Sequence, residues 1–496
     1  MMTETKSSGI LLPIPSLPSA YGIGDLGKEA YAFIDFLKKA GQKYWQILPI
    51  GPCGYGDSPY QSFSSFAGNP YLIDPERLME EGLLRKEEIS SIHWGDTASR
   101  TDYGILYEKR LPLLRRAFER FRTEQEAELT EYIRKEGEWL SEYALFMAVK
   151  KKFGGGPWTE WPKDIRLHKK DAVESYRSEL SEEVEFQCFL QYEFDRQWQS
   201  VLDHAHQNGI RIIGDIPIYV PLDSADVWTA PENYQLKRTR RPRVVAGCPP
   251  DAFSKNGQYW GNPIYDWEKM KNDGFSWWLM RIGSAKRHFD VVRIDHFRGL
   301  ESYWSIPAEN KTARKGHWEK GPGKAFVDAV KSAFPDMEFI AEDLGYLTPE
   351  VMELVRYSGW PGMKVLEFAF DPREPGMYLP HAYPENCVCY TGTHDNETLM
   401  QWCEGQSEEV IAYARNYLKI TEDDDLAEAI IQAGLHSKAG LFIVQMQDYL
   451  RLGKGSRMNH PGRLLPENWS WRLVPGQLTD ELCDEICTLS RKVGRA

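Results

Sequence analysis

Two short apolar runs, Val291-Val292-Arg293-Ile294-Asp295 and Phe339-Ile340-Ala341-Glu342, each end abruptly on a carboxylate. Runs of this kind are typical of strands that are buried on both faces of a parallel sheet. The same pattern recurs along the chain. It predicts strands at Tyr44–Ile50, Ile210–Ile218, Val291–Asp295, Glu338–Glu342, Met363–Phe368, Cys387–Asp395 and Leu441–Gln447.

Helical patterns lie between these strands, for example at 30–40 and 323–334. Strands that alternate with helices predict an α/β fold with a parallel sheet. A doubly wound nucleotide-binding sheet normally carries a glycine fingerprint after its first strand, and the segment Gly51-Pro52-Cys53-Gly54-Tyr55-Gly56 does not match it. We therefore predict a (β/α)8 TIM barrel, a single catalytic domain over residues 1–496 that is enlarged by insertions.

Two segments interrupt this alternation of strands and helices. Residues 78–206 carry apolar side chains at helical spacing, as in Leu114, Phe118 and Phe121, which predicts a mainly helical insertion. Residues 231–267 are irregular and contain a dense cluster of Gly, Asn and Pro. Such a loop is typical of a flap over an active-site cleft.

The composition narrows the classes of function. A net charge of −13 repels nucleic acid and anionic membrane surfaces, and 18 apolar residues never run together, so we expect neither a nucleic acid nor a membrane as a partner. Aromatic residues make up 13% of the chain, and sugar rings stack well on such side chains, although an aromatic-rich core explains the same composition. The eight cysteines form no C-x-x-C pair, which favours reduced thiols in a cytoplasmic protein.

Four acidic side chains close predicted strands: Asp215, Asp295, Glu342 and Asp395. Barrel active sites form at the carboxyl ends of the strands, so we expect these side chains to meet in one pocket. Strand alternation puts Arg293 on the same face as Asp295, where its guanidinium would keep that carboxylate ionised. A carboxylate about 5 to 5.5 Å from a carboxylic acid of raised pKa cleaves a glycosidic bond with retention of configuration. The competing interpretation is a Mg²⁺ or Mn²⁺ site that includes His296 or His394.

Three motifs resemble those of the amylomaltases, the 4-α-glucanotransferases of the α-amylase superfamily. They are Arg293-Ile-Asp295-His-Phe-Arg298-Gly299, Ala341-Glu342-Asp343-Leu344-Gly345 and Gly392-Thr393-His394-Asp395-Asn396. The segments 247–254, 260–263 and 56–62 also resemble the acceptor-side loop and the sugar-stacking segment of that family. The resemblance covers nearly the whole chain.

This resemblance implies a retaining transferase that acts on maltooligosaccharides and α-1,4-glucans, without a cofactor or a catalytic metal. It implies that Asp295 is the nucleophile, Glu342 the acid/base and Asp395 the transition-state stabiliser. It further assigns the donor sugar to Arg293, Asp215, His394 and Tyr60, the glucan path to Ser58, Asp251, Trp260, Asn262 and Asp371, and the cleft rim to Asn459–Arg463 with Asn468 and Trp469.

The chain departs from ordinary α-amylases in ways that the resemblance to amylomaltases explains. Its segment Asp215-Ile-Pro-Ile-Tyr219-Val220 lacks the calcium-binding asparagine of those enzymes, so we expect no structural calcium. The sequence after the last predicted strand is too short for a C-terminal β-sandwich. Two other functions stay open: an α-glucan hydrolase with the same three carboxylates, and a glucan-binding protein without catalysis. The second would lack the acid or the nucleophile, and both are present.

Overall fold

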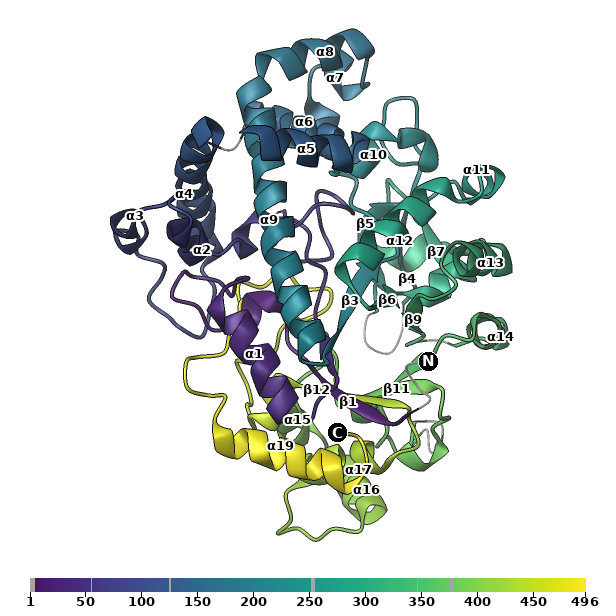
Figure 1. The fold of residues 1–496 in the computed structure, drawn as a ribbon. Coiled ribbons are helices and arrows are strands. Elements are labelled where there is room, and N and C mark those ends of the chain that lie inside the picture. The colour runs from purple at the N-terminus through teal and green to yellow at the C-terminus, as the bar shows by residue number, and fades with distance from the viewer. Residues whose placement is uncertain are drawn as a thin grey trace.

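The computed structural model describes residues 5–54, 56–124, 126–250, 255–345, 347–373, 376 and 378–496. Its centre is a closed barrel of parallel strands (Figure 1). The order around the barrel is β1 (Ser7–Leu11), β12 (Leu441–Gln445), β11 (Cys387–Tyr390), β10 (Gly362–Val365), β9 (Glu338–Ala341), β6 (Val291–Asp295), β3 (Arg211–Pro217) and β2 (Tyr44–Gln46). The predicted (β/α)8 barrel is confirmed.

Strand β1 is the barrel strand that the sequence analysis missed. Its residues Ser7-Ser8-Gly9-Ile10-Leu11 are all buried, yet three of the five are not apolar, so the run does not have the pattern of a buried strand. Gly9 is needed because a Cβ atom there would meet the Tyr44 carbonyl oxygen of β2 at 2.5 Å. The close approach of two backbones, rather than apolar side chains, makes this strand fit.

Helices cover the outside of the barrel. Helix α1 (Lys28–Lys39) turns Ala30, Phe33, Ile34 and Leu37 to the core, as the predicted helix at 30–40 requires. The predicted helix at 323–334 is α13 (Lys324–Ala333). The other helices between barrel strands are α12 (Ser276–His288), α14 (Pro349–Ser358), α15 (Leu399–Gly405), α16 (Glu408–Leu418) and α17 (Leu426–His436).

A group of helices precedes β3. Helices α5 to α8 lie at the top of the view in Figure 1, around one end of the long helix α9 (Ser181–Gln207). Because α9 contacts α5 and α6 as well as α1 and β3, it joins this group to the barrel. The remaining bounds are α2 (Pro75–Glu80), α3 (Lys86–Ser90), α4 (Tyr103–Glu124), α5 (Glu126–Glu136), α6 (Glu138–Lys152), α7 (Lys163–Arg166) and α8 (Lys170–Glu179).

A second, antiparallel sheet stands at the carboxyl ends of the barrel strands. Its order is β5 (Gln258–Pro263), β4 (Val244–Cys248), β7 (Ser302–Pro307) and β8 (His317–Lys320). The segment 231–267, expected as an irregular loop, thus contributes two strands, flanked by α10 (Ala225–Thr229) and α11 (Trp267–Asn272). The expectation of an irregular loop was wrong because β4 pairs with β7, far along the chain, and local sequence does not reveal that pairing.

After β12, the described residues 446–496 contain helices α18 (Met446–Tyr449) and α19 (Asp480–Lys492), and no C-terminal β-sandwich, as predicted. Arg495 closes the opposite end of the barrel from the site. Its buried guanidinium donates to four carbonyl oxygens, those of Ser7, Leu435, Ser437 and Ala439. Among the helices described, none has the length and apolar character needed to span a bilayer.

Candidate active site

The guanidinium of Arg293 joins two of the predicted carboxylates. Asp215 on β3 pairs in register with Arg293 on β6, so both side chains point into the barrel mouth. Arg293 Nη1 donates to Asp215 Oδ2 at 2.6 Å and to Asp295 Oδ1 at 2.9 Å. Burial raises the pKa of Asp215 to about 7, although the Arg293 charge acts in the opposite direction. The positive charge between these two carboxylates is thus the guanidinium of Arg293.

Glu342 lies directly beside this ion pair. Ile294 and Ala341 are partners in the sheet, so Asp295 and Glu342 each stand one residue beyond a paired position on adjacent strands, about 4.8 Å apart in backbone. Glu342 is 8% exposed, and its two oxygens accept the backbone N–H groups of His296 at 2.7 Å and Leu344 at 2.8 Å. This side chain is held in one orientation, next to the residue that follows Asp295.

Burial also controls the protonation of Glu342. It raises the pKa of this carboxyl to about 8; Arg293 lowers it, and the negative charge of Asp295 raises it further. At neutral pH the group is mostly a carboxylic acid. The site thus contains a carboxylic acid next to a carboxylate that is bonded to a guanidinium.

His394 and Asp395 enter the site from the loop after β11. The His394 ring stacks on Tyr60, with centroids 5.0 Å apart and an interplanar angle of 24°. Tyr60 in turn donates its hydroxyl to Asp215 Oδ2 at 2.9 Å. Burial lowers the pKa of His394, which keeps the imidazole neutral at pH 7. Asp395 Oδ1 accepts the side-chain amide of Asn459 at 2.6 Å.

The other predicted site residues divide into three groups. Ser58 accepts the Tyr60 backbone N–H at 3.3 Å, and Trp260 on β5 meets the His296 ring edge to face, with centroids 4.9 Å apart. Asn262, also on β5, is buried. Asp371 instead forms a local pair with Arg373, whose hydrogen bonds lower the Asp371 pKa to about 2. Asp251 lies outside the described residues.

Arg457 is a functional candidate that the sequence analysis did not identify. It donates to the Asp395 carbonyl at 2.7 Å from a long segment, 450–479, that contains neither a helix nor a regular strand. A strand-end pattern therefore gave no signal for it. Trp469, which was assigned only to the cleft rim, lies 5.9 Å from the Tyr60 ring and 5.8 Å from the His394 ring, measured between centroids.

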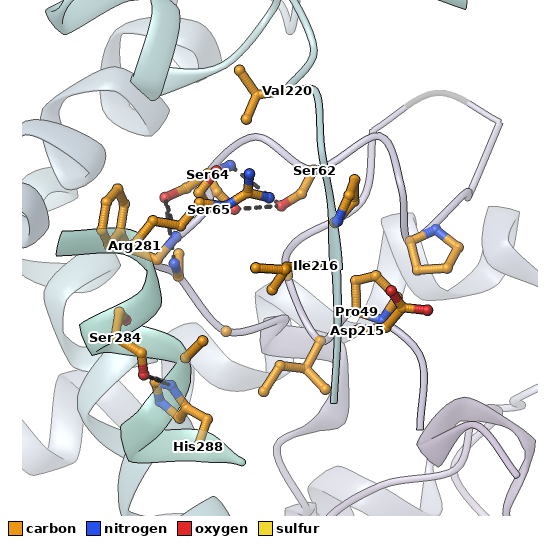
Figure 2. Close-up of a pocket in the computed structure, with 18 of the residues that line it drawn as sticks. Pro49, Ser62, Ser64, Ser65, Asp215, Ile216, Val220, Arg281, Ser284 and His288 are labelled. Carbon is orange, nitrogen blue, oxygen red and sulfur yellow. Dashed lines mark hydrogen bonds between the residues drawn. The ribbon is translucent and has the colours of Figure 1, made fainter. Parts of the chain in front are cut away.

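A cavity of about 70 Å³ lies behind Asp215, between β3, the segment that carries Ser62, Ser64 and Ser65, and helix α12 (Figure 2). Arg281 reaches from α12 toward these serines. Within the described part of the chain, Asp215 Oδ1 and the Nε and Nη1 atoms of Arg281 have no hydrogen-bond partner. Asp215, Arg281 and the three serines give this cavity a polar part, and its volume is sufficient for ordered water to bond to these atoms.

The competing interpretation of these carboxylates is a Mg²⁺ or Mn²⁺ site among the residues that are described. Nowhere among them do three or more His, Cys, Asp or Glu side chains converge in a way that could hold a metal ion. The carboxylates of Asp215 and Asp295 instead meet the guanidinium of Arg293.

Comparisons with known proteins show what the chain is similar to. The glycoside hydrolase family 77 model, described as 4-alpha-glucanotransferase, matches residues 12–478. The 4-alpha-glucanotransferase of Clostridium butyricum is 48% identical over 97% of this chain and 99% of its own, and that of Thermus thermophilus is 47% identical over 97% of each. The solved amylomaltase from Streptococcus agalactiae, in complex with acarbose, has a TM-score of 0.97 at 40% identity and covers 99% of this chain and 100% of its own.

Proposed function

The chain belongs to the 4-alpha-glucanotransferases of glycoside hydrolase family 77, and on this premise we propose how its side chains carry out the transfer. The reaction proceeds by double displacement with retention of configuration. A segment of α-1,4-glucan or maltooligosaccharide passes first to the enzyme and then to the 4-OH of an acceptor glucan or glucose.

Asp295 is the proposed nucleophile. The hydrogen bond from Arg293, at 2.9 Å, holds the carboxylate that must attack the anomeric carbon. Arg293 is nearly fully buried, so water screens its charge only weakly. The same guanidinium binds Asp215, which fixes its direction and therefore that of Asp295.

Glu342 is the proposed acid and base, and its environment is the observation that carries the proposal. A carboxyl with a pKa of about 8 holds the proton that the leaving glycosidic oxygen needs. After the first product leaves, the same group, now ionised, accepts the proton of the incoming 4-OH. One residue serves both steps because they are the reverse of each other.

The remaining side chains are proposed to hold the two sugars. Asp395 stabilises the oxocarbenium-like charge, and Asp215, His394 and Tyr60 bind the donor ring. The glucan path is proposed to include Ser58, Asp251, Trp260, Asn262 and Asp371. Trp260 and Asn262 support this through their place on β5, in the small sheet at the site.

The organisation of the chain enters the same proposal. Residues 78–206 and 231–267 are insertions into one catalytic barrel, and the second covers the cleft, where it favours a sugar acceptor over water. The enzyme works without a cofactor. All eight cysteines lie among the described residues as thiols rather than disulfides, which supports a reducing, cytoplasmic location.

Incubation with maltotriose tests the transfer. A transferase yields glucose together with oligosaccharides longer than maltotriose, whereas a hydrolase yields only shorter products. The variants Asp295→Asn and Glu342→Gln should lose turnover by about 10³-fold or more if the assignments hold. Normal turnover by either variant would reject that residue's role.

A further inference from the structure

We propose that Arg457 is a positioning residue for Asp395: its guanidinium holds the Asp395 loop against the segment that carries Asn459. The inference rests on the proposed role of Asp395 in stabilising the transition state. Arg457 itself touches no reacting atom in this scheme. It acts on the backbone that determines where the Asp395 carboxylate points.

The contacts of Arg457 reach both sides of one hydrogen bond. Nη2 donates to the Asp395 carbonyl at 2.7 Å, and Nε donates to the Asn459 carbonyl at 2.7 Å. The side chains of these same two residues meet, with Asn459 Nδ2 donating to Asp395 Oδ1 at 2.6 Å. One guanidinium therefore fixes the backbones of a donor and an acceptor whose side chains bind each other.

A third contact fixes the guanidinium itself. Arg457 Nη1 lies 3.3 Å from Glu397 Oε1, and the Arg457 side chain is 17% exposed. The Glu397 carbonyl accepts from Gln445 at the end of β12. Through Glu397, the orientation of Arg457 is thus tied to the rigid barrel, which a flexible loop alone would not provide.

Arg457 joins two described segments that have no regular secondary structure to hold them in place. Residues 391–398 follow β11 and precede α15, and residues 450–479 join α18 to α19; in both, the described structure contains neither a helix nor a regular strand. The hydrogen bonds between Thr393 and Asn396 stay within the turn. They shape the turn but do not attach it to Asn459.

The planar shape of the arginine guanidinium makes the proposal specific to Arg457. Arginine can donate to two carbonyls at once because its N–H groups diverge in one plane, whereas the lysine ammonium is a single point at the end of a flexible chain. Arg457→Lys should therefore keep the charge near Glu397 and at most one carbonyl contact. Arg457→Met removes every contact at a similar side-chain length.

The experiment measures kcat, KM and thermal midpoint for both variants with maltotriose as substrate. Arg451→Met serves as the matched control, because Arg451 lies in the same segment but pairs with Asp425 and Glu428. Misplacing a catalytic group by about 1 Å costs on the order of 10²-fold in rate. We expect Arg457→Met to lower kcat by about that factor with KM changed less than about threefold, and Arg457→Lys to recover part of kcat.

Three results would overturn the inference: a kcat for Arg457→Met equal to that of Arg451→Met, a loss confined to KM, or a loss that parallels a fall in thermal midpoint in both Arg457 variants. If Arg457→Met does not fold, Arg457→Lys alone supplies the same comparison. Asp395→Asn, measured in parallel, distinguishes a failure of the proposed role of Asp395 from a failure of the positioning role of Arg457. An active Asp395→Asn rejects the proposed function, whereas an inactive Asp395→Asn with a fully active Arg457→Met rejects only the positioning role.

Discussion

Glu342, the proposed acid/base, should make the folded enzyme less stable at alkaline pH, and Glu342→Gln should remove that effect. In the folded protein the pKa of Glu342 is raised from 4.5 to about 8. The folded state therefore keeps a proton that the unfolded chain releases. Stability from this group is complete below pH 4.5, declines as the pH rises, and levels off above pH 8.

The size of the effect follows from the two pKa values. With about 1.4 kcal/mol per pKa unit, this group makes the free energy of unfolding fall by roughly 3 kcal/mol between about pH 6 and pH 9. In Glu342→Gln that decline is absent. The variant also has a constant loss in the free energy of unfolding of about 1 to 3 kcal/mol. This loss does not vary with pH, because it arises where the amide nitrogen faces one of the two backbone N–H groups that Glu342 now accepts.

Urea denaturation of the wild type and of Glu342→Gln at both pH values isolates the pH-dependent contribution of Glu342 to the free energy of unfolding. The destabilisation of the variant, measured relative to the wild type, should shrink by roughly 3 kcal/mol on going from about pH 6 to pH 9. Glu80→Gln, at an exposed position, is the control and should show no such change. A difference between wild type and Glu342→Gln that does not vary with pH would refute the reasoning.

Three further predictions follow from individual contacts. The kcat/KM of the wild type should decline above about pH 8, where Glu342 loses its proton, and a profile that stays flat to pH 10 would contradict this assignment. Tyr60→Phe keeps the ring that stacks on His394 but loses the 2.9 Å bond to Asp215, so kcat/KM should fall by about 5- to 30-fold, and an unchanged value would show the hydroxyl to be dispensable. Arg495→Met removes the guanidinium that donates to four buried carbonyl oxygens, of which that of Ser437 also accepts from Lys6, and should lower the free energy of unfolding by about 3 kcal/mol or more, measured by urea denaturation, with KM unchanged.

Local sequence patterns were enough to predict the barrel and the contact at the centre of the candidate site. Strands β3, β6 and β9 are built around short apolar runs, and each brings an acidic residue to the end of the barrel where active sites form. Alternation along β6 also predicted that Arg293 and Asp295 share a face, and the structure places Arg293 Nη1 2.9 Å from Asp295. These features depend on residues that are close in sequence and on the fixed geometry of a strand.

Features that depend on contacts between distant segments become visible only in the folded chain. Strand β1 is held by backbone packing at Gly9, and β4 by pairing with β7. The raised pKa of Glu342 requires its burial, and the contact of Arg457 with Asp395 joins residues 62 positions apart. No local pattern encodes such contacts, because they come into being when the barrel closes and brings the loops together at its mouth.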